Sequence, residues 1–287
     1  MKINKNLIIL SLLLIFGMSL SAVSAADSAD ISVDAVSADN FANIASVDAT
    51  SDNNKNISDL SASAKEDDKE INSLGDTKEV TDGNFDTLKN TIEGANAGDI
   101  IKVSGTYKFN SQITIYKSIT VMSENGAILN GNKGRIFNIT PNNVIIDGLT
   151  FINAYSNERG PHGGGGGSAL YIAKSNVIVK DCKFINNTAD GSYSSGGALF
   201  TTTNCYNISI MNCSFVNCSA TNGGAIYFGG NGVVSDCSFV NCTAHIGGAI
   251  YCSEGSSVNY CIFDNNDAGV GKAIYGGLND YNFNFFS

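Results

Sequence analysis

The string Gly223-Gly224-Ala225-Ile226-Tyr227 returns 24 residues later as Gly247-Gly248-Ala249-Ile250-Tyr251. Looser copies are Gly167-Ser168-Ala169-Leu170-Tyr171, Gly196-Gly197-Ala198-Leu199-Phe200 and Gly271-Lys272-Ala273-Ile274-Tyr275. Short β-type strings joined by glycine turns, with a fixed period in the low twenties, are typical of a solenoid. The pattern leaves open whether the Ile or the Tyr of each string points inward.

A second repeated string places an Asn two residues after a Phe. The phenylalanines are Phe151, Phe184, Phe215, Phe239 and Phe263, and the asparagines are Asn153, Asn186, Asn217, Asn241 and Asn265. If equivalent residues lie about 4.8 Å apart in neighbouring strands, the Phe side chains form a buried column. The Asn residues suit a corner, because Asn tolerates left-handed backbone angles and stacked amides can hydrogen-bond to one another.

The cysteines follow the same repeat. Alternation in Val177-x-Val179 and a corner at residues 180–181 turn Cys182 to the interior; its equivalents are Cys213, Cys237 and Cys261, with Leu149 in the earliest coil. Exchange with Leu indicates buried, free thiols. Cys218 and Cys242 lie one coil apart, which leaves a disulfide between them as an alternative. No Cys-x-x-Cys pair occurs, so we expect no metal site.

Asn-x-Ser/Thr acceptors occur at Asn56, Asn138, Asn186, Asn207, Asn212, Asn217 and Asn241. Their number is a modest signal for glycosylation, because the repeat composition generates such triplets. We expect Asn186, Asn217 and Asn241, in the corner column, to be engaged internally.

The N-terminal part differs in composition. Residues 1–26 combine Lys2 and Lys5, an apolar run and small residues, which predicts a cleaved secretory signal; the alternative, a retained membrane anchor, would be short for a span. Residues 27–80 carry thirteen Asp/Glu against four Lys and almost no aromatics, which predicts a disordered acidic spacer. Residues 81–287 carry eleven Lys/Arg against fourteen Asp/Glu, so we expect no nucleic-acid partner.

Residues 81–287 are expected to form one all-β domain, a single-stranded parallel β-helix. Phe85, Leu88 and Ile92 share one face of a helix expected at about residues 84–95. A short amphipathic helix there would cap the open core and strand edges of the first coil.

The Gly-Gly-Ala-Ile and Phe-x-Asn strings resemble the repeats of chlamydial polymorphic outer-membrane proteins. Over about residues 82–277, the layout resembles the adhesin-like right-handed parallel β-helix proteins of methanogenic archaea. The resemblance implies a right-handed, secreted, surface-exposed β-helix with a role in adhesion or the cell envelope. The route of surface attachment stays open.

Three functions follow from these observations. The first is a non-catalytic, extracellular adhesin-like or envelope protein, without cofactor, whose lateral faces contact cell-surface glycans or envelope components. The second is a pectate-lyase-like polysaccharide lyase or glycosidase that uses Glu158, Arg159 and His162, with Asp147 or Asp181 nearby. Against it, a glycine-rich loop would not hold catalytic groups at fixed separations. The third is a structural module that self-associates through the solenoid ends, with Phe283, Phe285 and Phe286 as plugs.

Overall fold

The structure, a computed structural model, describes residues 75–157 and 165–287. By internal contacts the chain divides into residues 1–66 and 67–287, and the described residues all lie in the second unit. The predicted signal and most of the predicted spacer therefore lie outside the described residues. No helix within the described ranges is long and apolar enough to span a membrane.

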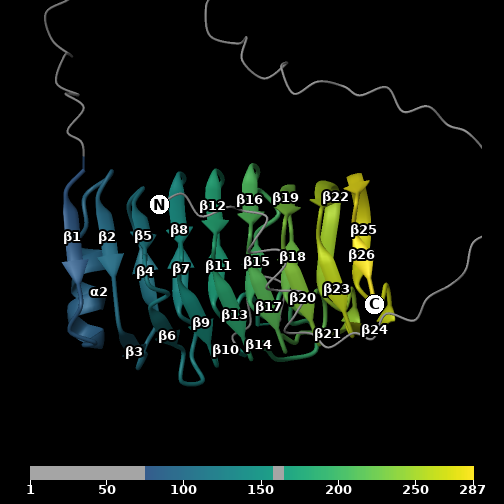
Figure 1. Ribbon diagram of the computed structural model, residues 1–287, viewed down its shortest axis with the longest axis horizontal. Coiled ribbons are helices and arrows are strands. Elements are labelled where there is room, and N and C mark those ends of the chain that lie inside the picture. Colours follow the sequence, from purple (N-terminus) through teal and green to yellow (C-terminus); the bar gives the residue numbers. More distant parts are fainter. Residues whose placement is uncertain (1–74, 158–164) are drawn as a thin grey trace, which may run out of the picture. The chain divides into compact units, whose positions relative to one another are not determined.

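The described residues form a right-handed parallel β-helix of about eight turns (Figure 1). Its first face consists of β1 (Thr77–Val80), β2 (Ile100–Val103), β5 (Thr120–Met122), β8 (Val144–Asp147), β12 (Val177–Lys180), β16 (Ile208–Met211), β19 (Gly232–Ser235) and β22 (Ile250–Asn259). The all-β parallel solenoid expected from the repeats is confirmed.

Two further faces close each turn. The second face contains β3 (Thr106–Lys108), β6 (Ile128–Asn130), β9 (Thr150–Ile152), β13 (Lys183–Ile185), β17 (Ser214–Val216), β20 (Ser238–Val240), β23 (Ile262–Asp264) and β26 (Phe285–Phe286). The third contains β4 (Ile113–Ile115), β7 (Phe137–Ile139), β11 (Leu170–Ile172), β15 (Leu199–Thr201) and β18 (Ile226–Phe228). The long strand β22 runs through both the third and the first face and pairs with β25 (Ile274–Asn282). Short pairs β10 (Tyr155–Ser156) with β14 (Thr188–Ala189) and β21 (Thr243–Ile246) with β24 (Asp267–Val270) lie between the second and third faces in chain order.

The core follows from alternation along very short strands. In β12, Val177 and Val179 are buried while Ile178 and Lys180 are only partly covered, and the neighbouring strand β8 repeats this pattern in register. Each strand is too short to be stable alone, but stacking in register joins the inward side chains into one continuous core.

The two glycines of each Gly-Gly pair are required for different structural reasons. Gly223 has φ +61°, a left-handed angle that a side chain would strain. Gly224 lies so close to the next turn that a Cβ would sit 2.1 Å from the carbonyl oxygen of Gly248. The first glycine therefore bends the chain, and the second allows neighbouring turns to approach.

A single α-helix lies near the start of the described residues. Helix α2 (Phe85–Glu93) begins after Asn84, whose side chain accepts hydrogen bonds from the backbone N–H of Asp86 and Thr87. Phe85, Leu88 and Ile92 are buried on one face, and the ring of Phe85 lies 5.1 Å from that of Phe109. The helix thus places its apolar face against the first turns of the core.

The β-helix begins earlier than the sequence indicates. Strand β1 pairs with β2 in register, from Thr77 against Ile100 to Val80 against Val103. It is held by Asp99, which accepts hydrogen bonds from the N–H of Asp76 at 2.9 Å and from the Lys78 ammonium at 2.6 Å. The predicted boundary at residue 81 is therefore wrong, since strand 77–80 belongs to the sheet.

Candidate functional site: the outer columns of the β-helix

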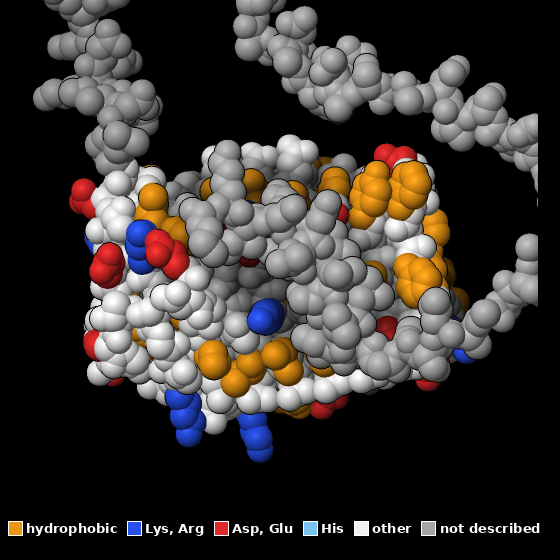
Figure 2. Space-filling model, in the orientation of Figure 1, with side chains coloured by type: hydrophobic (Ala, Val, Ile, Leu, Met, Phe, Trp, Pro, Cys, Tyr) orange, Lys and Arg blue, Asp and Glu red, His pale blue; other side chains and the backbone are white. Residues whose placement is uncertain are grey.

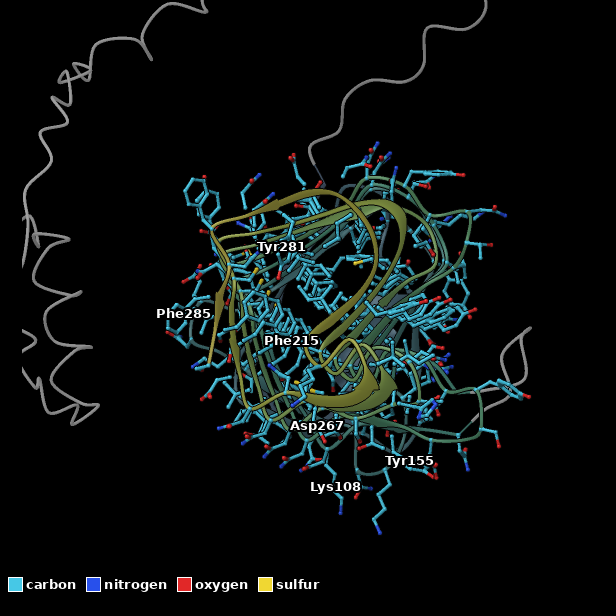
Figure 3. All side chains as sticks on the ribbon, turned by 90° about the vertical axis from the view of Figure 1, so that its right-hand side faces the viewer. Lys108, Tyr155, Phe215, Asp267, Tyr281 and Phe285 are labelled. Atoms are coloured by element: carbon cyan, nitrogen blue, oxygen red, sulfur yellow. The ribbon has the colours of Figure 1, made fainter. Side chains whose placement is uncertain are left out.

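The predicted phenylalanine residues form a stacked column inside the second face. Neighbouring rings lie 4.7–4.9 Å apart and within about 5° of parallel, and Phe286 extends the column beyond Phe263 at 5.0 Å. The members are Phe151, Phe184, Phe215, Phe239 and Phe263, each at most 1% exposed. Figure 3 looks onto the C-terminal end of the stack and shows Phe215 within the ring of strands. This column supports the fold and is not accessible to a ligand.

The predicted corner asparagines have left-handed backbones, with φ between 51° and 55°. Asn153, Asn186, Asn217, Asn241 and Asn265 all expose their side chains. The Nδ2 of Asn217 donates to Oδ1 of Asn186 at 3.1 Å. The expected engagement within the corner column is therefore seen between Asn186 and Asn217, although the side chains are exposed. The left-handed angle turns the amides outward, where one links to the next.

All eight cysteines, from Cys182 to Cys261, are buried free thiols. Cys182, Cys213, Cys237 and Cys261 occupy one inward column, and the thiol of Cys182 donates to the carbonyl oxygen of Lys180 at 3.1 Å. Cys218 and Cys242 are buried without a disulfide between them. Burial raises the pKa of the Cys218 thiol and raises the pKa of Cys252 to about 12, so these thiols stay protonated at neutral pH.

The structure describes only the two aspartates of the lyase alternative, Asp147 and Asp181. Glu158, Arg159 and His162 lie outside the described residues. Asp147 forms an ion pair with Lys180 at 3.0 Å, and Asp181 accepts a hydrogen bond from Nδ2 of Asn212. Over the described ranges, no group of three or more His, Cys, Asp or Glu side chains is arranged to hold a metal ion.

An outer aromatic ladder runs along the third face. Tyr171, Phe200, Tyr227, Tyr251 and Tyr275 occupy equivalent outward positions on successive strands, paired in register. Their ring centroids lie 4.7–5.3 Å apart. The preceding residues Leu170, Leu199, Ile226 and Ile250 are fully buried, so the Ile or Leu points inward and the aromatic residue outward.

Before its last ring, Tyr275, the ladder presents ring edges and hydroxyl groups to the outside, because each ring face is covered by a neighbouring side chain. Among the described residues, no hydrogen bond joins the four tyrosine hydroxyls to protein atoms. Partial burial raises the pKa of Tyr171 and of Tyr227 above the usual value, so both hydroxyls are protonated at neutral pH. The third face thus carries a row of tyrosine hydroxyl groups, interrupted at Phe200, that can donate and accept hydrogen bonds.

Arg135 fixes the start of this ladder. Its guanidinium lies 5.1 Å from the ring centroid of Tyr171, a cation–π contact. It also donates to the carbonyl oxygen of Gly166 at 3.0 Å and to Oγ of the buried Ser156 at 2.8 Å. These contacts and one to the carbonyl oxygen of Gly167 tie residues 166–167 to strand β10. The sequence alone did not indicate this role of Arg135.

A groove of about 550 Å³ lies on the outer corner between the first and second faces. We call it the corner groove. It is lined by Asp181, Cys182, Lys183, Asn212, Cys213, Ser214, Asp236, Cys237, Ser238, Tyr260 and Ile262. Its size falls in the range of ligand sites, about 300–1,000 Å³.

The corner groove arises from two outward columns in register. One is the left-handed corner position directly before each inward cysteine, occupied by Asp181, Asn212, Asp236 and Tyr260. The other is the outward position of the second face, where the small Ser214 and Ser238 lie between Lys183 and Ile262. In the sequence, the corner groove could have been suspected from the polar residues that precede the inward cysteines. Only the strand register shows that Ser214 and Ser238 leave a hollow beside those residues.

The last turn leaves large apolar side chains uncovered. Phe283 is 78% exposed and Phe285 62%, while Tyr281 and Phe286 are also exposed. Figure 2 shows hydrophobic side chains gathered at the right-hand edge, where Figure 1 has β25 and β26, and Figure 3 shows Phe285 outside the ring of strands. Phe283 and Phe285 are too exposed to plug the end as expected, whereas Phe286 stacks on Phe263 and covers the end of the phenylalanine column.

Comparison of the chain with known protein families and with curated proteins gives no match.

Proposed function

We propose that the protein is a secreted, non-catalytic β-helix that contacts cell-surface glycans or cell-envelope components through its lateral faces, as adhesin-like proteins do. The outer aromatic ladder carries the proposal. It is a row of half-covered rings whose hydroxyls have no partner among the described residues, and it is repeated at the strand spacing. Amphipathic Tyr side chains are enriched at protein interfaces, because they combine apolar area with a polar tip.

The geometry of the ladder favours contact with an extended surface or chain. Because the rings before Tyr275 are covered on their faces, a ligand meets the edges and hydroxyls of those rings and does not stack on their faces. A polymer lying parallel to the helix axis would meet equivalent hydroxyls about 4.8 Å apart at Tyr227, Tyr251 and Tyr275, with Phe200 separating them from Tyr171. Repetition of weak contacts raises avidity without any single deep pocket.

The test is a glycan array together with a pull-down of cell-envelope fragments, using purified protein. The double variant Tyr227→Phe, Tyr251→Phe removes two hydroxyls and keeps the stacked rings, so stability should change little. We expect the wild-type protein to bind and the double variant to bind more weakly. Absence of binding in both assays, with cleavage of a polyuronate in calcium buffer, would refute the proposal and favour the lyase.

A further inference from the structure

The corner groove combines the chemical groups that a sugar ring requires. Ser214 and Ser238 expose hydroxyls along its wall, and Asn212 and Asp236 add an amide and a carboxylate. The side chain of Asp236 is exposed, and within the described ranges it forms no ion pair. Hydroxyl, amide and carboxylate groups are together both donors and acceptors, as the hydroxyls of a saccharide need.

One end of the corner groove is apolar. The ring of Tyr260 is 56% exposed and stacks on Phe283 at 5.1 Å, within 5° of parallel. Phe283 lies one turn further along the chain, so the opposite face of Tyr260 is turned toward Asp236 and the corner groove. Ile262, 51% exposed, borders the ring. Unlike the inner rings of the outer aromatic ladder, which have a neighbour on both faces, Tyr260 therefore offers one face to a ligand.

The charge of the corner groove selects among sugars. Asp181 and Asp236 contribute two negative charges and Lys183 one positive charge, all on exposed side chains. The net charge of the lining is therefore negative, which disfavours polyuronates and other anionic polymers. Of the saccharides that could use the hydroxyls and the aromatic face, neutral ones fit without a charge penalty.

We propose that the corner groove is a binding site for a neutral oligosaccharide, which packs an apolar ring face on Tyr260 and hydrogen-bonds to Asp236 and to Ser214 and Ser238. This proposal rests on the glycan-contact function proposed above, but it assigns the specific contact to the corner between the first and second faces. The outer aromatic ladder lies on the third face and belongs to a separate surface.

The test titrates the purified full chain with neutral hexasaccharides of glucose, mannose, xylose and N-acetylglucosamine, and with hexagalacturonate, by calorimetry. Ser238→Lys fills the corner groove from an outward position, and Asp236→Asn removes the carboxylate charge. The matched control is Ser209→Lys, because Ser209 also points outward but lies on the first face. Urea unfolding of each variant checks that the fold is retained.

We expect at least one neutral hexasaccharide to bind. Ser238→Lys and Tyr260→Ala should each weaken binding at least tenfold, and Asp236→Asn should weaken it measurably, while Ser209→Lys leaves it unchanged. The site is refuted if no neutral hexasaccharide binds, if hexagalacturonate binds more tightly, or if Ser238→Lys has no effect. Binding that survives Ser238→Lys but is lost in Tyr227→Phe, Tyr251→Phe would refute the site and leave the general function standing.

Discussion

Removing one ring from the middle of the phenylalanine column tests the packing quantitatively. Phe215 is fully buried, and its ring lies 4.7 Å from that of Phe184 and 4.9 Å from that of Phe239. Truncation of a buried Phe to Ala costs about 3–5 kcal/mol. Phe215→Ala also removes two stacked ring pairs, each worth about 0.5–1.5 kcal/mol. We therefore expect the free energy of unfolding to fall by about 4–5 kcal/mol, near the upper end of that range.

The matched control is Phe200→Ala in the outer aromatic ladder. Phe200 also stacks on two neighbours, at 5.2 and 5.3 Å, but its side chain is only partly covered. We expect Phe200→Ala to lower the free energy of unfolding by about 1–2 kcal/mol, because the Phe200 ring buries less apolar area than the Phe215 ring.

The assay is urea unfolding followed by far-UV circular dichroism, because the chain has no Trp for fluorescence. With a urea dependence of about 2–3 kcal/mol per M, Phe215→Ala should lower the unfolding midpoint by about 1.3–2.5 M. The reasoning is refuted if Phe215→Ala costs no more than Phe200→Ala, because a buried and a half-exposed ring would then be energetically equal.

Three further predictions concern a turn, the thiols and one carboxylate. Gly224→Ala should destabilise the protein by about 2 kcal/mol or more, since its Cβ would clash with the carbonyl oxygen of Gly248; a change equal to that of Gly134→Ala, where the nearest atom is 3.4 Å away, would contradict this. In a thiol-reagent assay the native protein should react slowly and all eight cysteines should react after unfolding, because burial raises the pKa of thiols such as Cys252; fewer than eight would indicate a disulfide. Hydrogen bonding by Lys78 holds the pKa of Asp99 below its ordinary value of 3.8. The stability that ionised Asp99 contributes is fully present above about pH 4 and is lost as the pH falls through the lowered pKa of Asp99. Asp99→Asn should therefore be less stable at pH 7 and lose less on acidification; an unchanged acid profile would contradict the assignment.

The repeats predict the interior well, because a fixed period places equivalent residues above one another. The spacing of Phe215, Phe239 and Phe263 requires only that each turn has the same length, and the structure pairs them in register. The orientation of Ile226 and Tyr227 could not be deduced, because a three-residue strand has one outward position and the corner decides which residue takes it.

Strand β1 and the corner groove could not be predicted, because the contacts that form them leave no hydrophobic pattern in the sequence. Strand β1 reads Thr77-Lys78-Glu79-Val80 and is held by backbone pairing and Asp99, so its sequence resembles the acidic spacer before it. The corner groove depends on the small size of Ser214 and Ser238 relative to their neighbours one turn away, which becomes visible only when the turns are aligned in space.

The claim on which the fold and both proposed surfaces depend is that residues one turn apart are paired in parallel and in register. Nuclear Overhauser effects in a deuterated, amide-protonated sample measure this directly. The structure predicts inter-strand contacts from the backbone around Phe215 to that around Phe184 on one side and to that around Phe239 on the other. Contacts of Phe215 with an antiparallel hairpin neighbour, or a register shifted by one residue, would contradict the account.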